Sequence, residues 1–246
     1  LIADDENKGG YSESELNHTI NSDIIYNALS NHLNVSQFYG INYESLENGS
    51  YITKPQMTSD ILDYINQGVS LINYIGHGSE VALSGEKIID MERDLTHICN
   101  SETSCYKDNK PAIWVVGTCS FGKYDENNDI MSEKLLFDNF SAISIITTTR
   151  PIGPDDNSNY LDNLFNGIDD FITNSDNNNR IGDIVKDAKT NQNSGYLFHL
   201  LGDPALLLPF PKITSNLIDE NILKTIGLEI MDDIYPTLQD ANLNSE

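Results

Sequence analysis

Two residues in this sequence, His77 and Cys119, have the side chains and the settings needed for nucleophilic attack on a carbonyl group. Each follows a run of apolar residues that predicts a buried strand, residues 69–75 before His77 and residues 112–116 before Cys119. Sites in open α/β sheets form at the carboxyl ends of the strands. An imidazole can take the proton of a thiol and later return it to a leaving amine. The setting therefore makes Cys119 and His77 candidates for a dyad.

A dyad of this kind also needs donors for the oxyanion that forms during attack. Gly78 has no side chain, so its backbone N–H can approach a substrate oxygen closely. The N–H groups of Gly78 and Cys119 are the candidates. The ordinary alternatives are a turn with a surface histidine and a cysteine that only packs.

The other histidines lack a comparable setting. His18 and His32 lie in or beside a predicted helix, and His97 lies in a polar excursion that follows the first motif. His199 stands among apolar and aromatic residues, which is typical of a core histidine. None of the four is therefore a candidate base.

The elements that would position the dyad alternate between strands and helices. A capping box from Ser12 to Glu15 precedes apolar residues at helical spacing. Further strands are predicted at residues 35–39, 142–146 and 206–208, and further helices at residues 55–67, 129–138, 160–171 and 181–189. Alternating elements predict βαβ units, and the near-continuous apolar runs predict a largely parallel sheet covered on both faces.

Charge and composition exclude several classes of partner. The chain has 246 residues, with 38 acidic against 14 basic residues and a net charge of −24. Nucleic acid and anionic membranes are poor partners for such a surface. Cationic substrates or divalent ions fit its field, although the ordinary explanation is that the charge keeps a secreted or salt-exposed protein soluble. No apolar run approaches the ~20 residues of a membrane span, and the abrupt start at Leu1 suggests a fragment.

The three cysteines form no Cys-x-x-Cys pair, which argues against a structural zinc site. Cys99 and Cys105 could close a short disulfide loop in an oxidising compartment, or they could be two ordinary thiols. Cys119 is left over in either case. An unpaired thiol is a candidate for chemistry.

Both motifs resemble those of the gingipain-type cysteine peptidases of the caspase-like clan. The matching stretches are Leu71-Ile-Asn-Tyr-Ile-Gly-His-Gly78 and Trp114-Val-Val-Gly-Thr-Cys-Ser-Phe-Gly-Lys-Tyr-Asp125, supported by residues 1–5, 142–150 and 200–205. Within this family the likeness extends to the peptidase domain of the sortase of type IX secretion. The resemblance implies an α/β fold, a caspase-like three-layer sandwich with a mostly parallel sheet flanked by helices. It also implies that His77 and Cys119 are the catalytic dyad.

The resemblance covers residues 1–211 and predicts that they form the second, catalytic subdomain. Residues 212–246 are then a tail or the start of a following domain. The carboxylate that orients the catalytic histidine is expected in a preceding subdomain of the parent protein. The third catalytic group is therefore not assigned, although Glu80 and Asp125 lie near the motifs.

The resemblance also indicates where substrate and metal would bind. The segment after the strand at residues 142–146, with Thr149, Arg150, Asp155 and Asp156, would wall the primary specificity pocket. Asp155 or Asp156 could meet a basic side chain, and an ordinary solvated acidic loop is the alternative. Gingipain-like proteases bind calcium as a structural ion, and Asp4 and Asp5 offer oxygen ligands for it. No other cofactor is expected, and a solvated acidic turn is again the alternative.

The resemblance thus implies a secreted or cell-surface cysteine endopeptidase, on a bacterial outer surface, that acts on polypeptides through an acyl-enzyme. Either water or an amine could complete the reaction, giving hydrolysis or transpeptidation. A non-catalytic scaffold or binding module of a larger surface protein is the alternative from another class. A nucleotide-binding domain is disfavoured, because no glycine-rich phosphate loop follows any predicted strand.

Overall fold

The computed structural model describes residues 1–5, 16–48, 51–98, 111–126, 128–138, 141–174, 176–190 and 192–210. The chain divides into two compact units, Leu1–Lys212 and Ile213–Glu246, and every described residue belongs to the first unit. The predicted capping box at residues 12–15, the pair Cys99 and Cys105, and the predicted tail at residues 212–246 lie outside the described residues.

A six-stranded sheet forms the centre of the first unit, in the order β10-β9-β8-β5-β1-β2. Its strands are β1 (Ile2–Ala3), β2 (Phe38–Tyr39), β5 (Leu71–Ile75), β8 (Ala112–Gly117), β9 (Ala142–Thr148) and β10 (Phe198–Gly202). Every pairing is parallel except that of β10 with β9. The predicted mostly parallel sheet is confirmed.

The last predicted strand, at residues 206–208, is wrong. The chain pairs with β9 earlier, through β10. The carbonyl of Leu206 instead accepts the N–H of Ile181 at 2.9 Å, so it helps to begin a helix.

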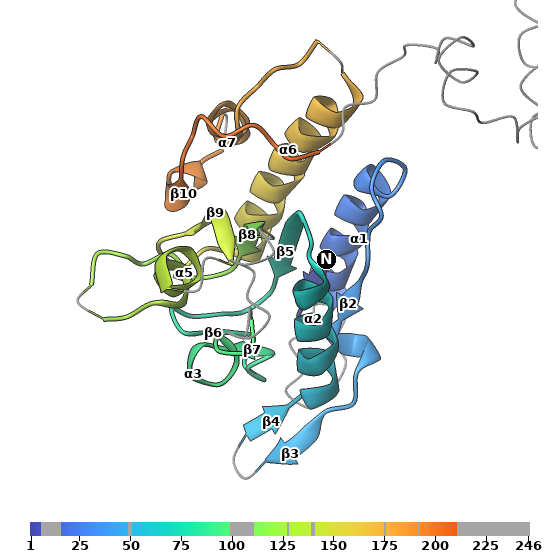
Figure 1. Ribbon diagram of the computed structural model, residues 1–246, viewed down its shortest axis with the longest axis vertical. Helices are drawn as coiled ribbons and strands as arrows, with labels where there is room; N and C mark the ends of the chain where they lie inside the picture. Colours follow the sequence, from blue (N-terminus) through green and yellow to red (C-terminus); the bar gives the residue numbers. More distant parts are fainter. Residues whose placement is uncertain are drawn as a thin grey trace, which may run out of the picture. The chain divides into compact units, whose positions relative to one another are not determined.

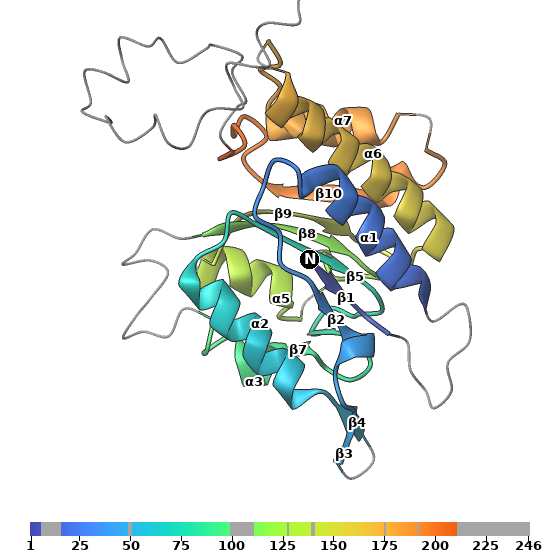
Figure 2. The same cartoon turned by 90° about the vertical axis from the view of Figure 1, so that its right-hand side faces the viewer.

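Helices cover both faces of the sheet (Figures 1 and 2). One face carries α1 (Asn17–Leu29), α6 (Pro154–Thr173) and α7 (Ile181–Ala188), and the other carries α2 (Pro55–Gln67), α3 (Met91–Asp94), α5 (Met131–Glu133) and the π-helical turn η3 (Lys134–Asp138). Smaller elements are η2 (Gly40–Asn42), β3 (Leu46–Asn48), β4 (Tyr51–Thr53), β6 (Ala82–Leu83), β7 (Ile89–Asp90) and η4 (Gly195–Leu197). None of the helices in the described ranges has the length and apolarity to cross a bilayer.

The central strands are buried on both sides, as their apolar runs predict. In β8, Ile113 and Val115 pack in the core under α1, α6 and α7. Their neighbours Trp114 and Val116 pack in the core under α2 and α5. Because side chains alternate along a strand, one apolar run supplies both cores.

Helix α1 forms where the periodicity predicts it but buries another face. The pattern ran through Leu16, Ile20, Ile24, Leu29 and Leu33. The first three are 37%, 52% and 48% exposed, whereas Leu29 is buried. The buried positions include His18, Ser22, Ile25 and Leu29, which recur at the same helical spacing. The side of α1 that meets the sheet is therefore partly polar, which apolar periodicity alone does not detect.

Candidate active site

The ends of β5 and β8 bring the two motifs together. These strands are parallel neighbours, and Ile75 pairs with Gly117. The N–H of Gly76 donates to the carbonyl of Gly117 at 3.3 Å, which extends the pairing past the strand end. His77 and Cys119 each lie two residues beyond the last paired position. The structure therefore places the side chains of both at the same edge of the sheet, with His77 exposed and Cys119 a half-buried free thiol.

The turn that carries Cys119 is held by buried side chains. The three carbonyl groups at positions 116, 117 and 118 each accept a side-chain hydrogen bond, from Thr147 (2.7 Å), Asn157 (3.0 Å) and Thr148 respectively. All three donors are at least nine-tenths buried. A backbone with its acceptors satisfied in this way has little freedom, so the turn beside the thiol is held in one conformation.

Ser120, directly after Cys119, has a φ of 56°. This left-handed conformation is unfavourable for a residue other than glycine, asparagine or aspartate. Strain of this kind concentrates at functional sites. It lies here at the residue that turns the chain away from the thiol.

The backbone of His77 is held on both sides. Its N–H donates to Oδ2 of Asp4 at 3.1 Å, and its carbonyl accepts the hydroxyl of Tyr74 at 2.5 Å and the N–H of Ser84 at 2.8 Å. Asp4 follows β1, the other neighbour of β5. These bonds position the backbone of His77 and leave its imidazole to be oriented by other contacts.

Burial strongly perturbs Asp4. Desolvation, followed by the nearby charge of Glu86, raises the pKa of Asp4 to about 6, although the hydrogen bond from the His77 N–H acts in the opposite direction. Gly76 lies against the same carboxyl group. A β-carbon at Gly76 would lie 2.3 Å from Cβ of Asp4 and 2.6 Å from the Tyr74 hydroxyl, so only glycine fits there.

The candidate oxyanion donors lie where the two motif loops touch. A β-carbon at Gly78 would lie 2.7 Å from the hydroxyl of Thr118, so the His77 loop rests directly on the Cys119 loop. Within the described residues, the backbone N–H groups of Gly78 and Cys119 donate to no protein acceptor. Both groups are thus available to a substrate, and their role as oxyanion donors stays a prediction.

The expected calcium ligands belong to a buried acidic cluster. Asp4, Asp5 and Glu86 each offer a carboxylate oxygen, and these atoms lie within 4.8 Å of one another. However, Lys54 contacts Asp5 at 2.8 Å, backbone N–H groups bond both oxygens of Asp4, and Ser84 donates to Glu86. Calcium requires six to eight oxygens. The three carboxylates could supply only part of such a shell, beside backbone carbonyls and waters, and Lys54 already supplies an opposing charge to Asp5, so a calcium ion here stays a prediction.

The predicted substrate-pocket residues lie in two places: Thr149 and Arg150 directly follow β9, whereas Asp155 and Asp156 come later in the chain. The Cys119 thiol lies 3.7 Å from the carbonyl of Ile152, so the segment after β9 borders this thiol. Thr149, at its start, is buried, whereas Arg150 is exposed and donates to Asp125 at 3.0 and 2.5 Å. That ion pair engages Asp125, one of the two acids near the motifs.

The interpretation of Asp155 and Asp156 as loop residues is wrong. Helix α6 begins at Pro154, so both occupy its first turn. Proline at the first helical position and acidic residues in the first turn favour this start. Asp156 accepts a hydrogen bond from Ser194 at 2.6 Å, whereas Asp155 is exposed.

Sequence reasoning set aside His18, which the structure places beside His77. His18 is 6% exposed, and its ring centroid lies 5.8 Å from that of His77. Its helical spacing with Ile25 and Leu29 was the available signal. His199 is half-buried on β10 beside Tyr124 rather than in the core, and burial lowers its pKa. Glu80, the other acid near the motifs, faces Lys123 at 3.6 Å.

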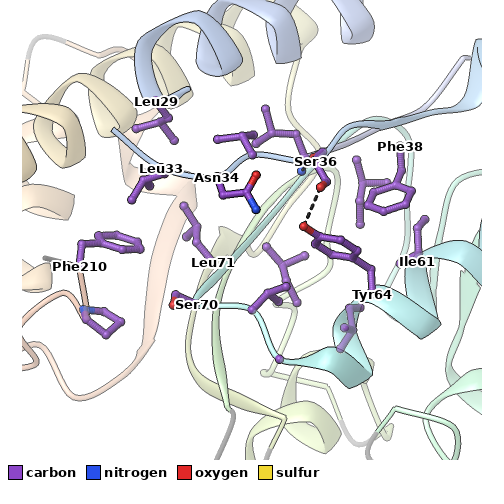
Figure 3. Close-up of a pocket in the computed structure, with 18 residues that line it drawn as sticks. Leu29, Leu33, Asn34, Ser36, Phe38, Ile61, Tyr64, Ser70, Leu71 and Phe210 are labelled. Carbon is purple, nitrogen blue, oxygen red and sulfur yellow. Dashed lines mark hydrogen bonds between the residues drawn. The ribbon is translucent and has the colours of Figure 1, made fainter. Parts of the chain in front are cut away.

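A separate apolar cavity lies away from this edge (Figure 3). It has a volume of about 350 Å³ and is lined near the amino ends of β1 and β5 by residues that include Leu1, Leu29, Leu71 and Phe210. In it the hydroxyl of Ser36 donates to that of Tyr64 at 2.7 Å. Because His77 and Cys119 follow the carboxyl ends of the strands, this cavity is not the candidate active site.

A mostly parallel sheet between helix layers, with a histidine and a cysteine at neighbouring strand ends, agrees with the caspase-like fold that the sequence predicts. The family model of peptidase family C25 matches residues 1–209. The chain therefore belongs to peptidase family C25, the gingipain family.

Solved structures show the same fold. The Arg-specific cysteine proteinase gingipain R (RgpB) is 19% identical, with a TM-score of 0.60 over 84% of this chain and 46% of that chain. The complex of the pro- and mature domains of RgpB from Porphyromonas gingivalis is 18% identical, with a TM-score of 0.59 over 84% and 48%. A third structure, of a protease, is 14% identical, with a TM-score of 0.55 over 76% and 44%. The chain thus spans just under half of each of these three chains. No curated protein sequence matches it.

Proposed function

We propose that this chain is the catalytic core of a cysteine endopeptidase in which Cys119 is the nucleophile and His77 moves the proton. The observation that carries the proposal is the parallel pairing of β5 with β8, in which Ile75 pairs with Gly117. His77 lies two residues beyond Ile75, and Cys119 lies two residues beyond Gly117. Membership of the C25 family supports the same reaction class.

The reaction follows from the groups at this edge. His77 takes the proton of the Cys119 thiol, and the thiolate forms a bond to the scissile carbonyl carbon. The N–H groups of Gly78 and Cys119 stabilise the resulting oxyanion. As the intermediate collapses, the C–N bond breaks and the leaving amine takes the proton from His77. Water then attacks the thioester with His77 as base, which releases the acid and restores the thiol.

The substrate is a polypeptide, in a secreted or cell-surface setting that the excess acidic charge suits. Asp155 is exposed in the first turn of α6 and is the better placed of the two acids to meet a basic side chain, because Asp156 is bonded to Ser194. An amine in place of water would give transpeptidation from the same acyl-enzyme. A preceding subdomain would complete the substrate cleft.

The test is the pH dependence of Cys119 alkylation by iodoacetamide, followed by mass spectrometry in wild type and His77→Ala. We expect labelling to begin well below the ordinary thiol pKa of about 8.5 and this low-pH reactivity to disappear in His77→Ala. Ordinary labelling in both proteins would reject the dyad and favour a non-catalytic scaffold. His97→Ala is the matched control, because this histidine lies near α3 rather than at the strand ends.

A further inference from the structure

A second histidine lies against the proposed base. His18 is in the first turn of α1 and is 6% exposed. Its ring meets that of His77 nearly at a right angle, with 87° between the ring planes and 5.8 Å between the centroids. Aromatic rings that interact edge to face are found at such separations.

Helix α1 is anchored so that this contact is built into the fold. Ile25 and Leu29 of α1 pack in the same core as Ile75, the last residue of β5. Leu29 also lines the cavity near the amino ends of β1 and β5, so the helix runs toward that end. Its first turn consequently lies at the opposite, carboxyl end of the strands (Figure 2). There the ring of His18 contacts that of His77.

A neighbouring ring can restrict the orientation of the His77 side chain. Its backbone is held by Asp4, Tyr74 and Ser84, but its side chain is exposed. An exposed side chain with staggered χ1 wells can leave the orientation that a dyad requires. The buried ring of His18 restricts this choice, because it is fixed within the helix face that also buries Ser22.

We infer that His18 is a positioning residue that holds the imidazole of His77 toward Cys119. The inference rests on the proposed function. It assigns His18 a packing role, so an aromatic ring of similar size should replace it, whereas a small side chain should not.

The experiment compares His18→Ala, His18→Phe and a control, His32→Ala. His32 follows α1 at its other end and lies 3.7 Å from Asp169. Two quantities are measured in the whole chain: the χ1 populations of His77 by NMR couplings, and the rate of Cys119 alkylation by iodoacetamide at pH 6.5. Thermal melts confirm that each variant is folded.

We expect His18→Ala to average the χ1 angle of His77 and to slow alkylation about 3- to 10-fold, the range that corresponds to an aromatic pair contact. His18→Phe should restore one rotamer and a rate within about twofold of wild type, and His32→Ala should change neither quantity. A single His77 rotamer with an unchanged rate in His18→Ala overturns the inference, as does a His18→Phe protein that behaves like His18→Ala.

The NMR measurement separates this inference from the proposed function. If alkylation does not depend on His77 at all, the dyad fails. The χ1 populations then still show whether His18 holds the ring, and averaging in wild type would reject the inference independently.

Discussion

Replacement of Lys54 by methionine tests the account of the acidic cluster. Lys54 directly precedes α2 and is 2% exposed, and its ammonium lies 2.8 Å from Oδ2 of Asp5. It also donates to the carbonyls of Gly40 and Tyr43 and to the hydroxyl of Ser45, at 3.0, 3.1 and 2.9 Å. Methionine keeps most of the side-chain volume and removes every one of these bonds.

The expected loss follows from what the substitution leaves behind. Removal of one partner from a buried ion pair costs about 3–5 kcal/mol, because the remaining charge has no compensation. Asp5 would then lie beside Asp4 and Glu86 with no cation contacting it. We therefore expect a loss of about 4 kcal/mol, which corresponds to a fall in Tm of about 8–16 °C in a domain of this size.

Urea unfolding followed by circular dichroism measures this loss. The double variant Lys54→Met/Asp5→Asn should recover part of it, because it also removes the isolated charge. Lys134→Met is the matched control, since its partner Asp129 is 78% exposed, and it should cost less than about 1 kcal/mol. A loss below about 1 kcal/mol in Lys54→Met would refute the reasoning. If calcium instead balances the cluster, EDTA should destabilise the wild type and added calcium should restore it.

Three further substitutions probe the site. The pKa of Asp4 is about 6 in the folded chain against 3.8 ordinarily, so folding favours its protonated form. The free energy of unfolding is therefore greatest below pH 4 and falls by about 3 kcal/mol as the pH rises toward 6. Asp4→Asn should thus raise Tm relative to wild type at pH 7.5 but not at pH 4, and an equal difference at both values would contradict the shift. Gly76→Ala should lower the free energy of unfolding by about 1–3 kcal/mol, measured from the urea midpoint, because its β-carbon overlaps Asp4. An unchanged midpoint would show that the loop adjusts. Asn157→Leu should cost about 1–3 kcal/mol and slow Cys119 alkylation, whereas lost stability with normal alkylation would assign Asn157 no positioning role.

The sequence predicts the strands of the site better than the groups that support it. Residues 71–75 and 112–117 form buried strands because an apolar run in a parallel sheet satisfies both faces at once. His77 and Cys119 then follow from chain direction alone. The sequence predicted neither which side of α1 is exposed nor the strand β10. Both depend on which elements meet in space, and local periodicity contains no such information.

The same distinction applies to Asp4. A pair of acids after a strand suggests metal ligands, and only the placement of β1 beside β5 shows that Asp4 accepts the N–H of His77. Asn157 likewise reaches the carbonyl of Gly117 across 40 residues of sequence. Such contacts join residues whose types are unremarkable in isolation, so no motif marks them.

These supporting contacts bear on whether the chain needs a preceding subdomain for its chemistry. Asp4 and Tyr74 hold the backbone of His77, and Asn157 with two threonines holds that of Cys119, all from within residues 1–210. His18 supplies a contact to the imidazole itself. A carboxylate from another subdomain would then strengthen the base rather than create the site. We therefore expect the isolated chain to show alkylation of Cys119 that depends on His77, even where it cleaves no peptide.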